Sequence, residues 1–208
     1  MAYDLEEQDQ IDALKTWWKT NGNMVVTAVT LAVVAFAGIQ GWKYYQHQQS
    51  VQASVQYQAL TQVDPKNLKA IQGISAGIME KYASTPYAGR AALAAAKANY
   101  MAKDSKSATA QLEWAAKNAK EDAVRTLALL QLAGIQFEQK AYDAALKTLA
   151  EKHEAGFDGL FSDLQGDILL AQGKKAEAKL AYIEALAKLD SQGHYRRFTE
   201  HKLEALGS

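Results

Sequence analysis

The residues of this chain that could do catalytic or metal chemistry are few and widely spaced. Its four histidines form no His-x-x-x-His pair of the kind that zinc sites use; they are His47, His153, His194 and His201. The absence of cysteine removes disulfides, thiol nucleophiles and cysteine-ligated metals. No glycine-rich phosphate loop or dinucleotide fingerprint occurs. The sequence therefore predicts a protein that is not an enzyme, uses no metal or cofactor, and keeps its histidines in solvent.

One uncharged stretch, Met24 to Gly41, organises the rest of the chain. Gln40 is its only strongly polar side chain. At about 1.5 Å per residue, this stretch and the aromatic residues that follow it reach roughly the 30 Å of hydrocarbon in a bilayer. Amphipathic rings favour the headgroup level, and here they flank both ends, as Trp17, Trp18, Trp42, Tyr44 and Tyr45. We therefore predict a transmembrane helix over residues 24–45.

Two other interpretations of this stretch are a buried helix of a soluble protein and a cleaved secretory signal. A buried helix is usually shorter or has a polar stripe. The triplet Ala35-Phe36-Ala37 resembles a signal cleavage site, but a signal peptide begins with a positive region. Residues 1–23 instead hold five acidic residues against Lys15 and Lys19. An uncleaved anchor in the lipid bilayer is the favoured interpretation.

The basic residues next to the anchor predict its orientation. Lys15 and Lys19 precede it, whereas only Lys43 follows it closely, so the positive-inside rule places residues 1–23 in the cytoplasm. The two sides differ by only one basic residue. The opposite orientation, in which the C-terminal domain is a receptor that faces the cytoplasm, therefore stays open. Within this N-terminal segment, Asn21-Gly22-Asn23 predicts a break in the helix just before the membrane.

Charge and length limit what the remainder can be. The chain has equal numbers of acidic and basic residues and no concentrated basic face, which argues against nucleic-acid binding. About 165 residues follow the anchor, enough for one domain with a substantial core. A helical pattern continues to Asp64-Pro65, and Asn67 to Tyr82 forms a second amphipathic run. Residues 46–86 are therefore predicted as a stalk and a first helical hairpin.

From Tyr87 onward the pattern is helical throughout, which makes the predicted fold class all-α. The helices also recur at similar intervals. Three segments align, and each is followed by a second helix that opens around a small residue: Ala108, Ala145 and Ala178. These are 37 and 33 residues apart, and a tetratricopeptide repeat has 34. The third unit is similar to that repeat at Gly166, Gly173, Ala178, Tyr182, Ala185 and Leu186. The first unit has Lys103 where the turn glycine stands. Residues 87–208 thus resemble a tetratricopeptide array with a C-terminal capping helix from Gly193.

The resemblance to tetratricopeptide arrays implies a concave surface that binds proteins or peptides. The positions that would face this groove are Arg90, Leu93, Lys97, Met101, Leu127, Leu130, Leu160, Asp163 and Asp167. The leucines among them could equally be ordinary core residues, because one sequence cannot separate lining from packing. Tyr100, Phe137 and Leu170 are expected in the interior.

As a whole, the chain resembles the YfgM family, the ancillary subunits of the SecYEG translocon. The resemblance covers the order of its features: Asp9 to Lys15, Asn21-Gly22, Gly41 to Tyr45, and Ala144 to Leu149. It implies a bacterial inner-membrane protein with a periplasmic domain, found with SecYEG and the periplasmic chaperone PpiD, that assists emerging secretory proteins. It supplies no catalytic residues. A different class of function, an envelope scaffold that assembles a cell-division or cell-wall complex, remains open.

Overall fold

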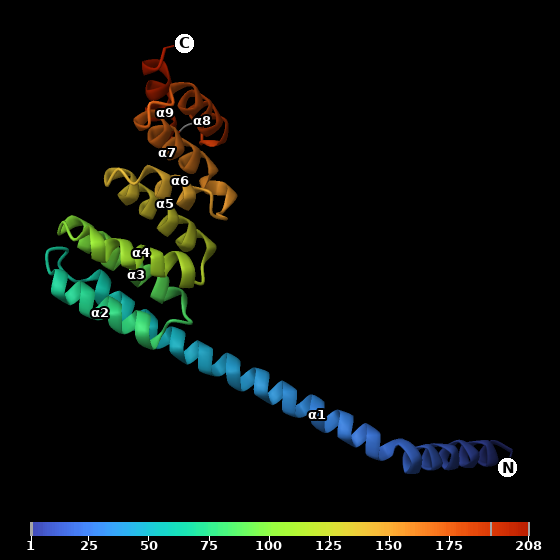
Figure 1. The fold of residues 1–208 in the computed structure, drawn as a ribbon. Coiled ribbons are helices and arrows are strands. Elements are labelled where there is room, and N and C mark those ends of the chain that lie inside the picture. Colours follow the sequence, from blue (N-terminus) through green and yellow to red (C-terminus); the bar gives the residue numbers. More distant parts are fainter. Residues whose placement is uncertain (1, 192, 208) are drawn as a thin grey trace. The chain divides into compact units, whose positions relative to one another are not determined.

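The computed structural model describes residues 2–191 and 193–207, and this part of the chain contains helices but no strands (Figure 1). The predicted all-α class is confirmed. The chain divides into two units, Met1–Gln48 and Gln49–Ser208, which are described separately. The boundary falls inside the first helix, α1 (Ala2–Thr61).

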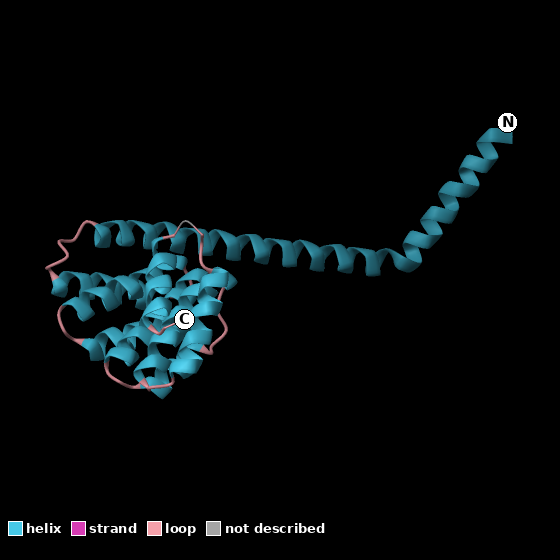
Figure 2. Cartoon of the chain, turned by 90° about the horizontal axis from the view of Figure 1, so that it is seen from above, coloured by secondary structure: helices cyan, strands magenta, loops and turns pink. Residues whose placement is uncertain are grey.

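Helix α1 runs through the predicted break at Asn21-Gly22-Asn23, so that prediction is wrong. The Asn21 side chain donates to the Trp17 carbonyl one turn back, at 3.1 Å, so it supports the helix instead of a turn. Gly22 lies against the Trp18 ring, which would be 3.1 Å from an added Cβ. A glycine costs a helix only about 1 kcal/mol, which its neighbours can offset. Figure 2 shows α1 bending once in its N-terminal part without losing its helical form.

In the unit Met1–Gln48, large apolar side chains point outward on every side of α1. Leu31 and Phe36 are each 64% exposed, and the valines and isoleucine between Met24 and Gly41 are similarly open or only half-buried. Among the described residues, α1 is the one helix that is long and apolar enough to cross a membrane, with a mean hydropathy of 2.0 in its most apolar window. This arrangement suits lipid, where apolar side chains face outward and the helix satisfies its own backbone.

The second unit begins with the last turns of α1, which pack against α2 (Leu68–Lys81) and α3 (Pro86–Met101). The turn before α2 ends at Asn67, whose side chain accepts from the Ala70 amide at 3.2 Å and caps the helix. Leu60, Ile71 and Ile78 form the buried centre of this contact. The end of α1 therefore acts as the first helix of a hairpin whose second helix is α2.

Three further hairpins follow in order along the stack (Figure 1). Their helices are α3 with α4 (Ser105–Asn118), α5 (Asp122–Glu138) with α6 (Tyr142–Leu149), and α7 (Asp158–Ala171) with α8 (Lys175–Lys188). A short 3₁₀ turn, η1 (Ala155–Phe157), precedes α7, and α9 (His194–Ala205) packs on the last hairpin. Trp114 of α4 is half-buried and packs against the clusters on both sides of α3.

Small residues allow the two helices of each hairpin to approach closely. The aligned alanines Ala108, Ala145 and Ala178 are all fully buried. At Gly166 the approach is closest, because a Cβ there would lie 2.4 Å from the ring of Tyr182, which is itself fully buried. The interior of this unit is accordingly built largely of alanine.

The turn inside each of these three hairpins has one residue with a left-handed backbone conformation, at the same place in the turn. Lys103, Lys140 and Gly173 have φ angles of 66°, 60° and 80°. In each, the next amide donates to a carbonyl five residues back, as Asp104 to Asn99, Ala141 to Gln136 and Lys174 to Leu169, at 2.8 to 2.9 Å. This is the Schellman closure of a helix. The backbone therefore repeats even where lysine replaces the glycine that the pattern prefers.

Candidate functional site

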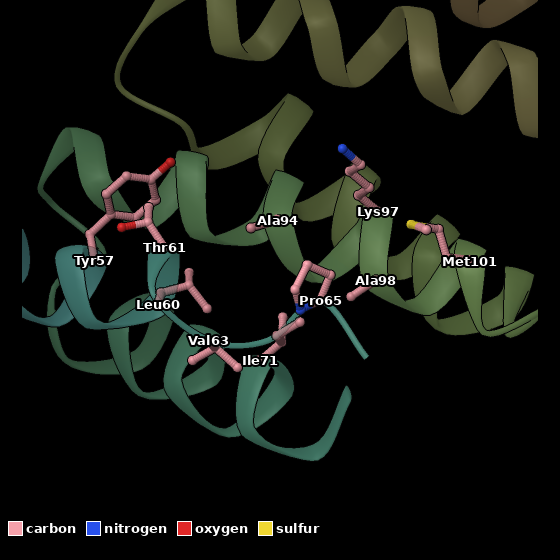
Figure 3. Close-up of a pocket in the computed structure, with 10 residues that line it drawn as sticks. All are labelled: Tyr57, Leu60, Thr61, Val63, Pro65, Ile71, Ala94, Lys97, Ala98 and Met101. Atoms are coloured by element: carbon pink, nitrogen blue, oxygen red, sulfur yellow. The ribbon is translucent and has the colours of Figure 1, made fainter. Parts of the chain in front are cut away.

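Two clefts open beside α3, between the first helices of neighbouring hairpins. The first, the α1–α3 cleft, has a volume of about 310 Å³ and lies between the end of α1 and α3 (Figure 3). Leu60, Val63 and Ile71 lie along its base in the figure, and Lys97 and Met101 project from α3. Its remaining lining residues are Tyr57, Thr61, Pro65, Ala94 and Ala98. Its wall is mostly apolar, as in sites that hold an apolar side chain.

The second cleft, the α3–α5 cleft, has a volume of about 420 Å³ and lies on the other side of α3. Its residues come from α3, α4 and α5: Ala96, Lys97, Tyr100, Leu112, Gln131, Gly134, Ile135 and Glu138. Gly134 has open space where a Cβ would be, which widens the cleft at this point. Lys97 is common to both clefts.

The charged groups of the two clefts differ in their partners. Lys97 is exposed and has no ion-pair or hydrogen-bond partner among the described residues. Tyr100 instead donates its hydroxyl to both Glu138 carboxylate oxygens, at 2.7 Å, and this bond raises the pKa of Tyr100. The cation of Lys97 is thus available to an incoming carboxylate, whereas Glu138 is already engaged.

Of the predicted groove residues, the structure places only Lys97 and Met101 at these two clefts. Arg90 is held in a two-pronged ion pair with Glu121, at 2.6 and 2.8 Å, and the hydrogen bond to Glu121 raises the pKa of Arg90. Leu93 and Leu130 are half-buried and pack against core clusters. The two remaining leucines, Leu127 and Leu160, are also half-buried and line neither cleft.

The two predicted acidic groove residues bind within the chain instead of facing open solvent. Lys202 of α9 lies 2.7 Å from a carboxylate oxygen of Asp163 and 2.7 Å from one of Asp167. Thr199 also donates to Asp163, and Tyr182 donates to Asp167, both at 2.8 Å. Burial disfavours the charged form of Lys202, but the two carboxylates outweigh it and raise its pKa. The capping helix therefore occupies the acidic part of the expected groove.

Sequence reasoning missed several features of this surface. Tyr100, which was expected in the interior, is 38% exposed and lines the α3–α5 cleft. The residues that α1 and the following turn contribute were not predicted, because periodicity alone does not show which helices meet. Of the capping helix, Leu203 and Leu206 pack on the last hairpin, whereas Tyr195 and Phe198 are exposed.

The structure offers no support for hydrolytic chemistry at a motif that sequence analysis overlooked, Gly73-Ile74-Ser75-Ala76-Gly77. A Gly-x-Ser-x-Gly nucleophile needs a strand-to-helix turn that exposes the serine. Ser75 instead lies inside α2, is 1% exposed, and its hydroxyl has no hydrogen-bond partner. It therefore has neither the activating base nor the access that a nucleophile requires.

Of the predicted solvent-exposed histidines, His153 differs. Its ring stacks on Phe161 at a centroid distance of 3.8 Å, and its Nε2 lies 3.2 Å from Asp158. The prediction of a solvated side chain is wrong at this position, because the loop after α6 folds the ring onto α7. Within the described residues, no three metal-ligating side chains gather at one place.

The stacked hairpins, their repeated turns and the apolar first helix define a tetratricopeptide repeat-like protein with a candidate membrane anchor. A family model described as a tetratricopeptide repeat-like domain matches residues 15–208. A comparison with solved structures finds no significant match.

Curated relatives specify the family further. Proteins named ancillary SecYEG translocon subunit are 33% identical in Neisseria gonorrhoeae, over 99% of this chain and 100% of the relative, and 32% identical in Haemophilus influenzae, over 89% and 91%. The Escherichia coli protein of that name is 30% identical over 88% of each chain. This chain therefore belongs to the family of ancillary SecYEG translocon subunits.

Proposed function

We propose that this chain is a single-pass membrane subunit that associates with the SecYEG translocon and binds other proteins without catalysing a reaction. The observation that carries the proposal is the 33% identity to a protein of that name over 99% of the chain. The architecture agrees with it, because helical repeats usually work as binding scaffolds. In this proposal the Lys15 and Lys19 side of α1 is cytoplasmic and the repeats are periplasmic.

The proposed binding site is the pair of clefts beside α3. Chains that emerge from a translocon are unfolded, so they expose apolar side chains that a folded protein would bury. The α1–α3 cleft offers apolar walls to such a side chain, and Met101, which is 64% exposed at its edge, can adapt to different shapes. A PpiD-like periplasmic chaperone, the partner that the family resemblance suggests, is the second proposed ligand of this surface.

A crosslinking experiment in intact cells tests the site. A photoreactive amino acid is placed at Lys97 or Met101, and matched controls carry it at Lys106 or Glu113, exposed positions of α4. We expect the two cleft positions to capture secretory proteins in transit or a periplasmic chaperone, and the control positions to capture far less. Equal capture at all four positions would contradict the assignment of the clefts.

A second experiment tests the association itself. The full-length chain is purified in mild detergent with residues 24–41 intact or replaced by an unrelated apolar span. We expect SecYEG to copurify with the natural chain. A chain that never copurifies with SecYEG, yet brings down cell-division or cell-wall proteins, would favour the scaffold function instead. A reporter fused after Ser208 that works only outside the cytoplasm tests the orientation.

A further inference from the structure

Helix α8 has an apolar stripe on the side that faces away from the hairpin core. Leu180 is 67% exposed and Ile183 is 47% exposed, and both lie opposite the buried face formed by Ala178, Ala181, Tyr182 and Ala185. Two exposed alanines extend the stripe by one turn in each direction, so that it consists of Ala176, Leu180, Ile183 and Ala187. Leu180 also lines a cleft of about 460 Å³ together with Leu146 and Leu149 of α6.

The other second helices show that the repeat does not require this stripe. Counted from the aligned buried alanines, the equivalent positions of α4 are Lys106, Ala110, Glu113 and Lys117, all exposed. In α6 the first two are Asp143 and Lys147, also exposed, before the helix ends at Leu149. Charged side chains are what a helix facing water usually carries. Of these three helices, α8 alone has large aliphatic groups at these positions, which indicates a surface that another helix covers.

The spacing of the stripe is that of a helix-pairing seam. Steps of four, three and four residues place Leu180 at an a position of a heptad repeat and Ile183 at the following d position. Glu177 and Glu184 then take e positions on one flank, and Lys179 takes a g position on the other. The two flanks therefore have opposite charge. Within one chain Glu184 pairs with Lys188 at 2.8 Å and Lys179 donates to the Gly207 carbonyl at 3.2 Å, so pairing between two copies exchanges these contacts.

The charges select both the partner and its direction. In a parallel pair of identical helices, a g position faces the e position five residues later on the other helix, so Lys179 would face Glu184 of a second copy. In an antiparallel pair the e flanks face each other, which would set Glu177 against Glu184 and place like charges together. The seam is thus complementary to itself in the parallel direction only.

We propose that α8 is a self-association surface at which two copies of this chain pair their α8 helices in parallel, with Leu180 against Leu180 and Ile183 against Ile183. Two heptads bury little surface, so the pairing depends on the high local concentration that a shared membrane gives to anchored chains. This inference does not depend on the clefts beside α3.

The absence of cysteine from the chain allows a direct test by disulfide crosslinking. Full-length Ile183→Cys is expressed at native level, and membrane vesicles are treated with a mild oxidant. The matched control is Glu113→Cys, at the equivalent position of α4. We expect a covalent dimer with Ile183→Cys and about tenfold less with Glu113→Cys. Adding Leu180→Asp to Ile183→Cys should lower the dimer to the level of the control.

A charge swap tests the direction of the pair. In the Ile183→Cys background, Glu184→Lys places Lys179 against another lysine and should reduce the dimer, whereas Lys179→Glu combined with Glu184→Lys should restore it. Equal crosslinking at Ile183 and Glu113, or failure of the double swap to restore the dimer, would overturn the proposal. Crosslinking of Ile183→Cys only to a different protein would also overturn it, and would show that α8 receives a foreign helix.

Discussion

The two units of this chain turn their apolar side chains in opposite directions. In Met1–Gln48, large groups such as Leu31 and Phe36 face outward. In Gln49–Ser208 the fully buried positions are mostly alanine, and large buried side chains such as Tyr182 and Ile168 are few. The difference teaches that apolar content alone does not define a core. Large apolar side chains that face outward suit lipid, whereas small side chains that face inward let helices pack closely in water.

The largest expected effect concerns the outward face. Two arginines at Leu31 and Val34 should each cost insertion about 2.5 to 3.5 kcal/mol. We expect Leu31→Arg/Val34→Arg to be released from membranes by sodium carbonate. Val55→Arg, an exposed valine of the same helix in the second unit, is the control and should remain in the membrane. Retention of the double variant would show that this segment does not lie in lipid.

A smaller effect is expected where the inward face is tightest. Gly166→Ala would place a methyl group 2.4 Å from the Tyr182 ring, so overpacking should lower the free energy of unfolding by about 1 to 3 kcal/mol. Gly134→Ala has nothing within 4 Å and should be neutral or stabilising by up to about 1 kcal/mol. Denaturant titration of both variants, followed by circular dichroism, measures the difference. Equal free energies of unfolding for the two variants would contradict the close approach of Gly166 to Tyr182.

The polar attachment of α9 predicts a loss of stability in alkali. Burial and the bond to Asp167 raise the pKa of Tyr182 well above its ordinary 10.0, and the two carboxylates raise the pKa of Lys202 above 10.5. A group with a raised pKa stabilises the fold fully below its ordinary pKa and loses that contribution as the pH rises. The denaturation midpoint should therefore fall above about pH 10. Tyr182→Phe should make this fall shallower; an unchanged pH profile would contradict the assignment.

The smallest effect concerns the turns of the second unit. Lys103 and Lys140 hold left-handed backbone that glycine adopts without strain, so Lys103→Gly and Lys140→Gly should each stabilise by a few tenths to about 1 kcal/mol. Glu113→Gly, in the middle of α4, should instead destabilise by about 1 kcal/mol. Thermal unfolding of the three variants compares them. Destabilisation by all three would mean that the lysine side chains contribute more than the backbone strain costs.

The sequence predicts the helical elements well because their signals are local. Apolar length marks the long N-terminal helix, and the recurring alanines Ala108, Ala145 and Ala178 mark the hairpins; the structure confirms these helices. That residues 24–45 cross a membrane stays a prediction. The break at Gly22 fails because a turn signal is only a preference, and a tryptophan ring fills the space beside it.

The candidate site is less predictable because it depends on contacts between distant segments. Lys97 and Met101 follow from the repeat pattern, but Tyr57 reaches the same cleft from another helix. Asp163 and Asp167 occupy positions of the repeat that predict groove residues. Lys202, more than thirty residues later, nevertheless neutralises both carboxylates. No local pattern contains that information.

The position of Trp114 gives the second unit its own spectroscopic reporter. Of the four tryptophans, Trp17, Trp18 and Trp42 belong to the first unit, and Trp114 alone lies in the second. Replacing the first three with phenylalanine would leave one fluorophore at the seam between neighbouring hairpins. Its emission would follow the opening of that seam, and hence the cooperativity of the array, without a label.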